Sequence, residues 1–429
     1  MKCNRFSIVV GVAAIVAAMA ATGMVPRAFA QTEQTLFNFS QIGGDGSGAG
    51  LTWDKPGKHL YGTSSSGGTT GAGLVFELSE KKGKWTPSVI YEFNSSQNTD
   101  GASPSSSLTL HDGAYYGVTQ AGGDPACGNC GVVFELKKVK GVWTETVLHS
   151  FEGGLDGAVP YGGVVFDSKG NIYGTTTIGG GSTNCEKGCG TIYKLAKVRG
   201  VWTVTILHAF TAWPADANPG QFYDGADPHW CTPVFDAQGN MYGTTAMGGL
   251  YEYSGTSGTV WKLTPGEKGA WNYQIIYNFD RFTQPDDGTM PLAGVTVGPD
   301  GNLYGAAEFG GVDANSGALF EVDTNGSSES TIFSFDYSNG ENPESPLVFD
   351  GEGNLYGTTW TGGSPDESGD GAVFELSPGG SGWSQSLLFG FSGSNGEALS
   401  SPVVLDSSRN IYGTTTGGGS DGVVFEITP

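Results

Sequence analysis

The sequence predicts an all-β fold, a seven-bladed propeller with four antiparallel strands in each blade, and two repeated elements carry that prediction. A Tyr-Gly step with apolar and Thr neighbours recurs about every 58 residues, which is the mark of a repeat architecture. A second element, most often Gly-x-Val-Phe-Glu-Leu, follows each Tyr-Gly step. Both elements occur seven times, which suits a propeller built from short strands. The tyrosines of the step are Tyr61, Tyr116, Tyr173, Tyr242, Tyr304, Tyr356 and Tyr412.

The four predicted strands of a repeat follow a fixed order. An apolar strand comes first, after an Asp-Gly or Asn-Gly pair such as Asp156-Gly157, and the Tyr-Gly-Thr-Thr strand comes second. The Val-Phe-Glu-Leu strand is third, and a strand often led by Trp, as at Trp85, is fourth. Between the first two strands, segments such as 167–171 read Asp-x-x-Gly-Asn, in which Gly and Asn tolerate the positive φ of a tight hairpin. Short antiparallel hairpins are therefore expected throughout.

The last repeat lacks its fourth strand, because the chain stops at Pro429 directly after the third-strand element. A matching fourth strand, Leu36-Phe37-Asn38-Phe39, stands near the N-terminus instead. We therefore expect the N-terminal strand to complete the last blade and close the ring, which also removes an exposed strand edge.

The first 30 residues predict a secretory signal peptide. Lys2 and Arg5 precede an apolar run over residues 8–21, and Ala28-Phe29-Ala30 forms a small-residue cleavage pattern. The apolar run is too short to anchor the chain firmly in a bilayer, although a retained anchor is the alternative. We expect a mature chain that begins at Gln31, is periplasmic or extracellular, has no membrane span, and forms one propeller domain over residues 31–429.

The mature chain is strongly acidic. Removing residues 1–30 takes away Lys2, Arg5, Arg27 and no acids, so the formal charge changes from −23 to −26. Nucleic acid is therefore excluded as a partner, since binding it requires clustered Lys and Arg. The charge suits a soluble protein outside the cell, and we expect a monomer. No cofactor or metal site is predicted, although abundant Asp and Asn oxygens leave calcium open without an EF-hand spacing.

The repeat also carries a family resemblance. The succession Asn-Leu-Tyr-Gly-Thr-Thr, Gly-Gly and Gly-x-Val-Phe-Glu-Leu resembles the GloVer tandem-repeat proteins, which are exported bacterial proteins of the choice-of-anchor kind, over nearly all of residues 34–429. The resemblance implies no activity, catalytic residue or cofactor. Members often bear a C-terminal surface anchor, whereas this chain ends with its last repeat, so anchoring by that route is not expected.

A functional site is expected where the repeat is broken, because a residue present in every blade is most simply structural. From the closing Phe of one repeat to the next Asp-Gly or Asn-Gly pair there are 4 to 8 residues at six junctions, but 14 from Phe210 to Asp224. The insertion and the segment after it contain Trp213, Tyr223, Asp224, Asp227, His229 and Trp230. Loops expected on the same rim add Glu308, Phe309 and Trp360.

Aromatic rings beside carboxylates favour a ligand-binding propeller that recognises a glycan or other polar polymer, or a protein surface, on the rim with the 211–231 insertion. The expected ligand-binding residues are Trp213, Tyr223, Trp230, Phe309 and Trp360. The alternative is an extracytoplasmic hydrolase or lyase acting on a polysaccharide. Its catalytic candidates are His229, Asp227, Asp224 and Glu308, without a known catalytic sequence signature. Simple loop filling is a third interpretation.

Two other histidines are not included among the candidate site residues. His149 and His208 occupy a slot that holds Phe or Tyr in the other repeats, so we expect them to pack as aromatic rings.

Five cysteines remain after export. Cys127 with Cys130, and Cys185 with Cys189, occupy the same loop in consecutive repeats. An exported protein favours disulfides over zinc, so each pair is expected to close on itself, with pairing across the loops as the alternative. Such short loops offer little chain-entropy stabilisation, and their expected role is to hold the rim in shape. Cys231 is expected to be a buried free thiol.

Overall fold

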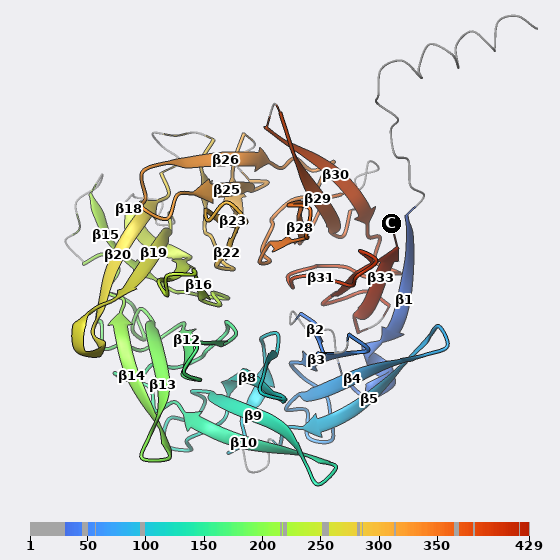
Figure 1. The fold of residues 1–429 in the computed structure, drawn as a ribbon, viewed down its shortest axis with the longest axis horizontal. Helices are drawn as coiled ribbons and strands as arrows, with labels where there is room; N and C mark the ends of the chain where they lie inside the picture. The colour runs from blue at the N-terminus through green and yellow to red at the C-terminus, as the bar shows by residue number, and fades with distance from the viewer. Residues whose placement is uncertain are drawn as a thin grey trace, which may run out of the picture.

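A computed structural model describes residues 31–428, apart from 45–49, 56, 95–98, 215–216, 218–220, 251–256, 281–283, 285, 313–314, 364–368, 381 and 420. The described chain forms a ring of seven four-stranded antiparallel sheets (Figure 1). The predicted propeller is thus confirmed. The predicted signal peptide, residues 1–30, lies outside the described residues.

The strands of each blade run from the centre of the ring outwards in chain order. Blades 1 to 3 contain β2 (Thr52–Trp53), β3 (His59–Ser64), β4 (Leu74–Lys81) and β5 (Lys84–Glu92); β7 (Thr109–His111), β8 (Ala114–Ala121), β9 (Val132–Val139) and β10 (Val142–Ser150); and β11 (Val165–Phe166), β12 (Ile172–Thr176), β13 (Thr191–Val198) and β14 (Val201–Ala209). In blade 2, β6 (Ala102–Pro104) also pairs with β8.

Blades 4 to 6 contain β16 (Val234–Phe235), β17 (Met241–Thr245), β19 (Thr259–Pro265) and β20 (Trp271–Asn278); β22 (Val295–Val297), β23 (Leu303–Ala307), β25 (Ala318–Val322) and β26 (Glu329–Ser334); and β27 (Val348–Phe349), β28 (Leu355–Thr359), β29 (Ala372–Gly379) and β30 (Gly382–Gly390). Short 3-10 turns occur as η1 (Phe39–Ile42) and η2 (Glu267–Gly269). The described residues contain no helix long and apolar enough to cross a bilayer.

The N-terminal strand closes the ring as predicted. Blade 7 combines β31 (Val404–Leu405), β32 (Ile411–Thr414) and β33 (Val423–Thr428) with β1 (Thr32–Asn38) as its outermost strand. Strand β1 pairs with β33 antiparallel, from Thr32 opposite Thr428 to Asn38 opposite Val423. Both ends of the described chain therefore share one sheet (Figure 1).

The glycine of each Tyr-Gly step makes room for an aromatic ring. In the antiparallel register, Gly305 lies opposite Phe320 of the third strand. A Cβ atom at Gly305 would come within 3.0 Å of that ring, a separation that real Cβ atoms essentially never show. The same close approach occurs in every blade, with Tyr193 and Trp261 in place of Phe in blades 3 and 4. Glycine is therefore required by packing at these positions, none of which has a positive φ.

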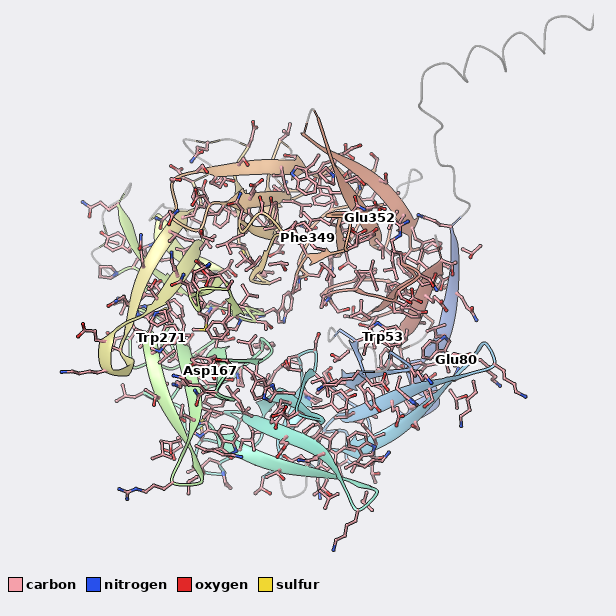
Figure 2. All side chains as sticks on the ribbon, viewed as in Figure 1. Trp53, Glu80, Asp167, Trp271, Phe349 and Glu352 are labelled. Carbon is pink, nitrogen blue, oxygen red and sulfur yellow. A yellow bond between two sulfur atoms is a disulfide. The ribbon has the colours of Figure 1, made fainter. Side chains whose placement is uncertain are left out.

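The tyrosine of each step joins a blade to the next. The ring of Tyr173 in blade 3 packs edge-on against Phe235 and Trp271 of blade 4, with centroids 5.2 and 5.8 Å away. Its hydroxyl donates a hydrogen bond to Asp167 of the preceding turn, at 3.0 Å. Figure 2 shows Asp167 and Trp271 at this blade boundary. The repeated Asp, Tyr and Trp are thus structural residues of the blade interface.

The Asp-Gly or Asn-Gly loops and the Gly-Gly loops lie on one rim of the ring, as predicted. In blade 4, β15 (Phe222–Ala226) pairs with β18 (Met247–Leu250), and in blade 5, β21 (Gly288–Thr289) pairs with β24 (Phe309–Gly310). Blades 1, 3, 6 and 7 have a single bridge at the same place. We call this face the loop rim; the hairpin turns within the blades occupy the opposite rim.

Replacing Gly305 by Ala should lower the melting temperature, because overpacking of this kind costs about 1–3 kcal/mol. Gly351→Ala is the matched control, since a Cβ atom there meets nothing within 4 Å. Thermal unfolding followed by circular dichroism measures both variants. Equal melting temperatures for the two variants would contradict the packing role of the Tyr-Gly step.

Candidate functional site

A cavity of about 250 Å³ lies at the inner strands, where segments of six blades converge. Its wall contains Ser106 of blade 2, Tyr161 of blade 3 and Trp230 of blade 4, together with valines of the inner strands. Ser106 is 5% exposed, and its hydroxyl has no hydrogen-bond partner. The cavity therefore combines an apolar wall with serine and threonine residues.

One loop position recurs beside this cavity in successive blades, and its residues in blades 2, 3 and 7, Ser105, Tyr161 and Ser400, line the cavity. Three residues after the Asp or Asn of the six Asx-Gly pairs in the described residues stands a residue with positive φ, such as Asp227 at 53°. Its N–H donates to a carbonyl of the preceding blade, as Asp227 N–H does to Cys189, and its carbonyl accepts an N–H from the end of its own second strand, as that of Asp227 does from Ala246. Two residues further on, the six blades with this turn present Ser105, Tyr161, His229, Leu292, Glu344 and Ser400. We call these six residues the mouth positions.

Blades 3 and 4 place an aromatic cluster at the mouth. The rings of Tyr161 and His229 are stacked, with centroids 4.5 Å apart and planes 21° apart. Trp230 packs edge-on against His229 at 4.8 Å. His229 Nδ1 lies 3.3 Å from Asp227 Oδ1, and each side chain is 27% exposed. Burial and the charge of Asp227 raise the pKa of Tyr161.

Blades 5 and 6 add two carboxyl groups. Burial raises the pKa of Glu308, and the nearby positive charge of His229 lowers it; burial is the larger effect, so the pKa is about 6. Burial and the negative charge of Glu308 raise the pKa of Glu344 to about 8. The Asn342 amide donates to the carbonyl of Glu308 at 3.2 Å and so links the two loops. Glu344 is 8% exposed, and no described residue forms a hydrogen bond or ion pair with its carboxyl.

The sequence-predicted residues are thus divided between two places. The structure brings Asp227, His229, Trp230 and Glu308 together at the mouth. Tyr223 instead lies in β15 at the outer edge of the ring (Figure 1), and Trp213 follows the outermost strand β14. Phe309 lies in β24 beside Glu308, and the backbone N–H of Trp360 bonds to Asn342 in blade 6.

Tyr161 and Glu344 were missed by sequence reasoning. Both occupy mouth positions, at which other blades carry Ser, Leu or His. Aligning the repeats at the mouth position would have revealed both residues, because the side chain there differs between neighbouring blades.

Asp224 does not join His229. Its carboxylate accepts from Nε2 of His208 at 3.0 Å and from the N–H of Thr211 at 3.0 Å. Burial raises the pKa of Asp224, but the hydrogen bond and charge of His208 outweigh it, so the pKa lies below its usual value. His149 binds Asp156 in the same way, at 3.1 Å. The two histidines therefore hold loops as well as packing as rings, which the sequence analysis did not foresee.

The local disulfide pairing is confirmed. Cys127 bonds to Cys130 and Cys185 to Cys189, while Cys231 is a buried free thiol. Burial raises the pKa of the Cys231 thiol to about 12. The two disulfides are consistent with an exported protein.

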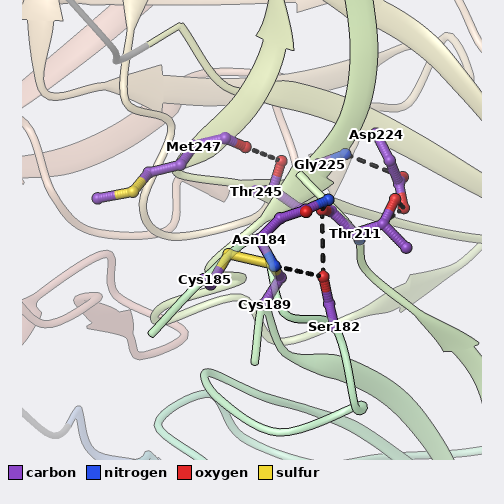
Figure 3. Close-up of a disulfide and its surroundings, with 9 residues drawn as sticks. All are labelled: Ser182, Asn184, Cys185, Cys189, Thr211, Asp224, Gly225, Thr245 and Met247. Carbon is purple, nitrogen blue, oxygen red and sulfur yellow. Dashed lines mark hydrogen bonds between the residues drawn. A yellow bond between two sulfur atoms is a disulfide. The ribbon is translucent and has the colours of Figure 1, made fainter. Parts of the chain in front are cut away.

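The disulfide loops support the mouth. The carbonyl of Cys189 accepts the N–H of Asp227 at 2.9 Å, and the carbonyl of Cys130 accepts that of Val159 at 2.9 Å. In the loop of the second disulfide, the Asn184 amide donates to the carbonyl of Thr211 at 2.7 Å, at the start of the insertion (Figure 3). Each disulfide loop thus fixes the residue that lies two positions before a stacked ring: Asp227 before His229, and Val159 before Tyr161.

No group of three or more His, Cys, Asp or Glu side chains is placed to hold a metal ion in the part of the chain that the structure describes. The carboxyl groups of Glu308 and Glu344, with pKa values raised to about 6 and about 8, can exchange protons near neutral pH.

A family model of the Gloeobacter/Verrucomicrobia repeat matches residues 22–227 and 227–429. The chain belongs to this repeat family. No curated protein matches this Gloeobacter/Verrucomicrobia repeat chain.

Solved structures similar to this repeat protein show the fold alone. The extracellular domain of a candidate one-component system from B. thetaiotaomicron is 10% identical, with a TM-score of 0.52 over 92% of this chain and 40% of that chain. A hypothetical selenium-binding protein from Sulfolobus tokodaii is 11% identical, with a TM-score of 0.50 over 77% and 74%. The periplasmic gluconolactonase of Pseudomonas aeruginosa is 13% identical, with a TM-score of 0.44 over 80% and 83%.

One blade junction predicts a pH dependence of stability. Asp100 of blade 2 corresponds to Asp224 of blade 4 and accepts a hydrogen bond from the Tyr91 hydroxyl at 2.9 Å. Burial, together with the negative charge of Asp100, raises the pKa of the nearby Glu145 to about 8. A raised carboxyl pKa means that the folded state favours the protonated form of Glu145. The contribution of protonated Glu145 to the free energy of unfolding is therefore lost as pH rises through about 8. Glu145→Gln should therefore unfold at a higher temperature than wild type at pH 9, but not at pH 5.

Exposed Glu152→Gln controls for the change in net charge. Melting temperatures from pH 5 to 9 measure the effect. Parallel curves for wild type and Glu145→Gln would contradict it.

Proposed function

We propose that this chain is an exported propeller that binds a glycan or another hydroxyl-rich polymer at the mouth of its central cavity. The observation that carries the proposal is the convergence of Tyr161, His229 and Trp230 with Glu308 and Glu344, which come from four different blades. Aromatic faces bury the apolar faces of sugar rings, and carboxyl groups accept hydrogen bonds from hydroxyls.

The polar groups at the mouth support a ligand of this kind. The Ser106 hydroxyl is buried without a partner, and Glu344 is 8% exposed with no hydrogen bond to its carboxyl from the described residues; such groups cost free energy unless a ligand or water satisfies them. A hydroxyl-rich molecule would satisfy both. A flat protein surface would instead meet the outer loops first, where Tyr223 lies.

A specific observation favours a second function, hydrolysis or elimination in a polysaccharide. The His229–Asp227 pair lies beside Glu308, and the pKa of Glu308 is raised to about 6. An imidazole held by a carboxylate, beside a carboxyl group that can be protonated near pH 6, suits general acid–base chemistry. In that function His229 would accept a proton, and Glu308 would donate one.

The test is a glycan array, run beside a panel of hydrolase and lyase substrates, with the purified mature protein. Trp230→Ala should weaken binding of the best glycan by about 1–3 kcal/mol, because a large aromatic ring is lost from the cavity wall. Trp213→Ala is the matched control, since Trp213 belongs to the outer insertion and should affect binding less.

His229→Ala separates the two functions. Loss of turnover with binding largely kept would indicate catalysis, and a parallel loss of affinity would indicate recognition. If Trp230→Ala binds as well as wild type while Trp213→Ala does not, the site lies on the outer insertion and the proposal is wrong.

A further inference from the structure

We propose that the ligand bound at the mouth carries an ammonium group, as an amino sugar does, and that Glu308 and Glu344 receive it. This inference rests on the proposed function and specifies the ligand class for the same site. Three independent features lead to it: the two carboxyls, the aromatic wall and the charge of the loop rim.

The first feature is a pair of neighbouring acidic side chains, of which Glu344 has no counterion among the described residues. Glu344 is 8% exposed, yet no Lys, Arg or hydrogen-bond donor among the described residues contacts its carboxyl. Glu308, in the neighbouring loop, raises the pKa of Glu344 further, and His229 is the one nearby group whose positive charge affects Glu308. Buried carboxylates need a cationic or hydrogen-bonding partner, which the described chain does not supply to Glu344.

The second feature is the nature of the cavity wall. Tyr161 and Trp230 present aromatic surface, and Val165, Val234 and Val295 complete an apolar lining. Organic ammonium groups bind favourably over aromatic faces beside a carboxylate. A hydrated metal ion would need several oxygen ligands, and the described residues include no such group. The wall therefore fits an organic cation better than an inorganic one.

The third feature is the polarity of the two rims. In the loops of the loop rim, Lys187 is the only lysine or arginine among the residues that the structure describes. Acidic residues are frequent there, including Asp124, Asp227, Glu308, Glu341, Glu344 and Glu397. The hairpin turns of the opposite rim carry most of the described cations, such as Lys82, Lys140 and Arg199. A rim of one sign attracts ligands of the other sign and accelerates their association.

Ammonium binding would be linked to proton release. A cation beside a carboxyl favours its ionised form, so the pKa of Glu344 should fall from about 8 when the ligand binds. At pH 6, where that carboxyl is protonated in the free protein, binding should release about one proton per ligand. A residue with a merely structural role would not produce this release.

The experiment is calorimetric titration of the mature protein with glucosamine oligomers at pH 6, in two buffers of different ionisation enthalpy. N-acetylglucosamine oligomers of equal length are the neutral comparison, and choline tests the ammonium group without the sugar. We expect at least a roughly tenfold preference for the amine over the neutral oligomer, weakened by salt, with proton release.

Glu344→Gln and Glu308→Gln should abolish most of that preference, whereas Glu397→Gln, the same substitution at an exposed position of the loop rim, should keep it. Thermal unfolding of each variant confirms folding. Equal binding of both oligomers would overturn the ammonium inference and leave glycan recognition standing. Failure of every amine to bind would also overturn the ammonium inference. The glycan array tests the proposed function separately, so the two outcomes can be distinguished.

Discussion

The close approach of an aromatic ring to the glycine of each Tyr-Gly step is the constraint on which the rest of the structure depends. Because Gly305 has no side chain, the ring of Phe320 can lie directly over the second strand. The tyrosine beside each glycine is then free to cross to the next blade, as Tyr173 does towards Phe235. The hydrophobic clusters accordingly span neighbouring blades rather than single sheets, as in the cluster that joins Tyr242 to Phe320. Ring closure by β1 completes this chain of contacts.

The candidate site is built from the same repeated parts, with the side chains changed. Every mouth position follows a positive-φ residue that is hydrogen-bonded to two blades, so its direction is set by the scaffold. Non-glycine residues in this conformation carry strain of about 1–3 kcal/mol, which persists only where the surroundings fix it. In blades 3 and 4 the disulfides restrain this residue further, because the carbonyls of Cys130 and Cys189 accept the N–H groups of Val159 and Asp227. Variation at one slot is thus enough to make an asymmetric site in a symmetric ring.

The sequence alone predicted the blade count, the strand order, the closure by Leu36 to Phe39, and both disulfides, because these depend on local motifs repeated in order. It also selected Asp227, His229 and Glu308. It did not predict that they meet Glu344, because the separation of residues in neighbouring blades depends on the radius of the ring and not on any local pattern.

The junction acids illustrate a pattern that the sequence contains but that only the contacts explain. Where the fourth strand offers Tyr91 or His208, which can donate to a carboxylate, the loop has Asp100 or Asp224. Where that slot holds Phe333 or Phe389, which cannot donate, the loop has Asn339 or Asn395 instead, although Phe37 in the same slot is followed by Asp45. The Asx residue caps the turn in both cases, as Asn339 does by accepting the N–H of Asp336. Asp224 therefore belongs to this structural series.

The most direct test of the central claim is a crystal structure of the mature protein soaked with the tightest-binding glycan from the array. The account predicts a sugar ring packed on Trp230 or Tyr161, with hydroxyl or ammonium groups within hydrogen-bond distance of the Glu308 and Glu344 carboxyls. Ligand density only over the outer insertion near Tyr223, or only on the rim of hairpin turns, with an empty cavity mouth, would contradict it.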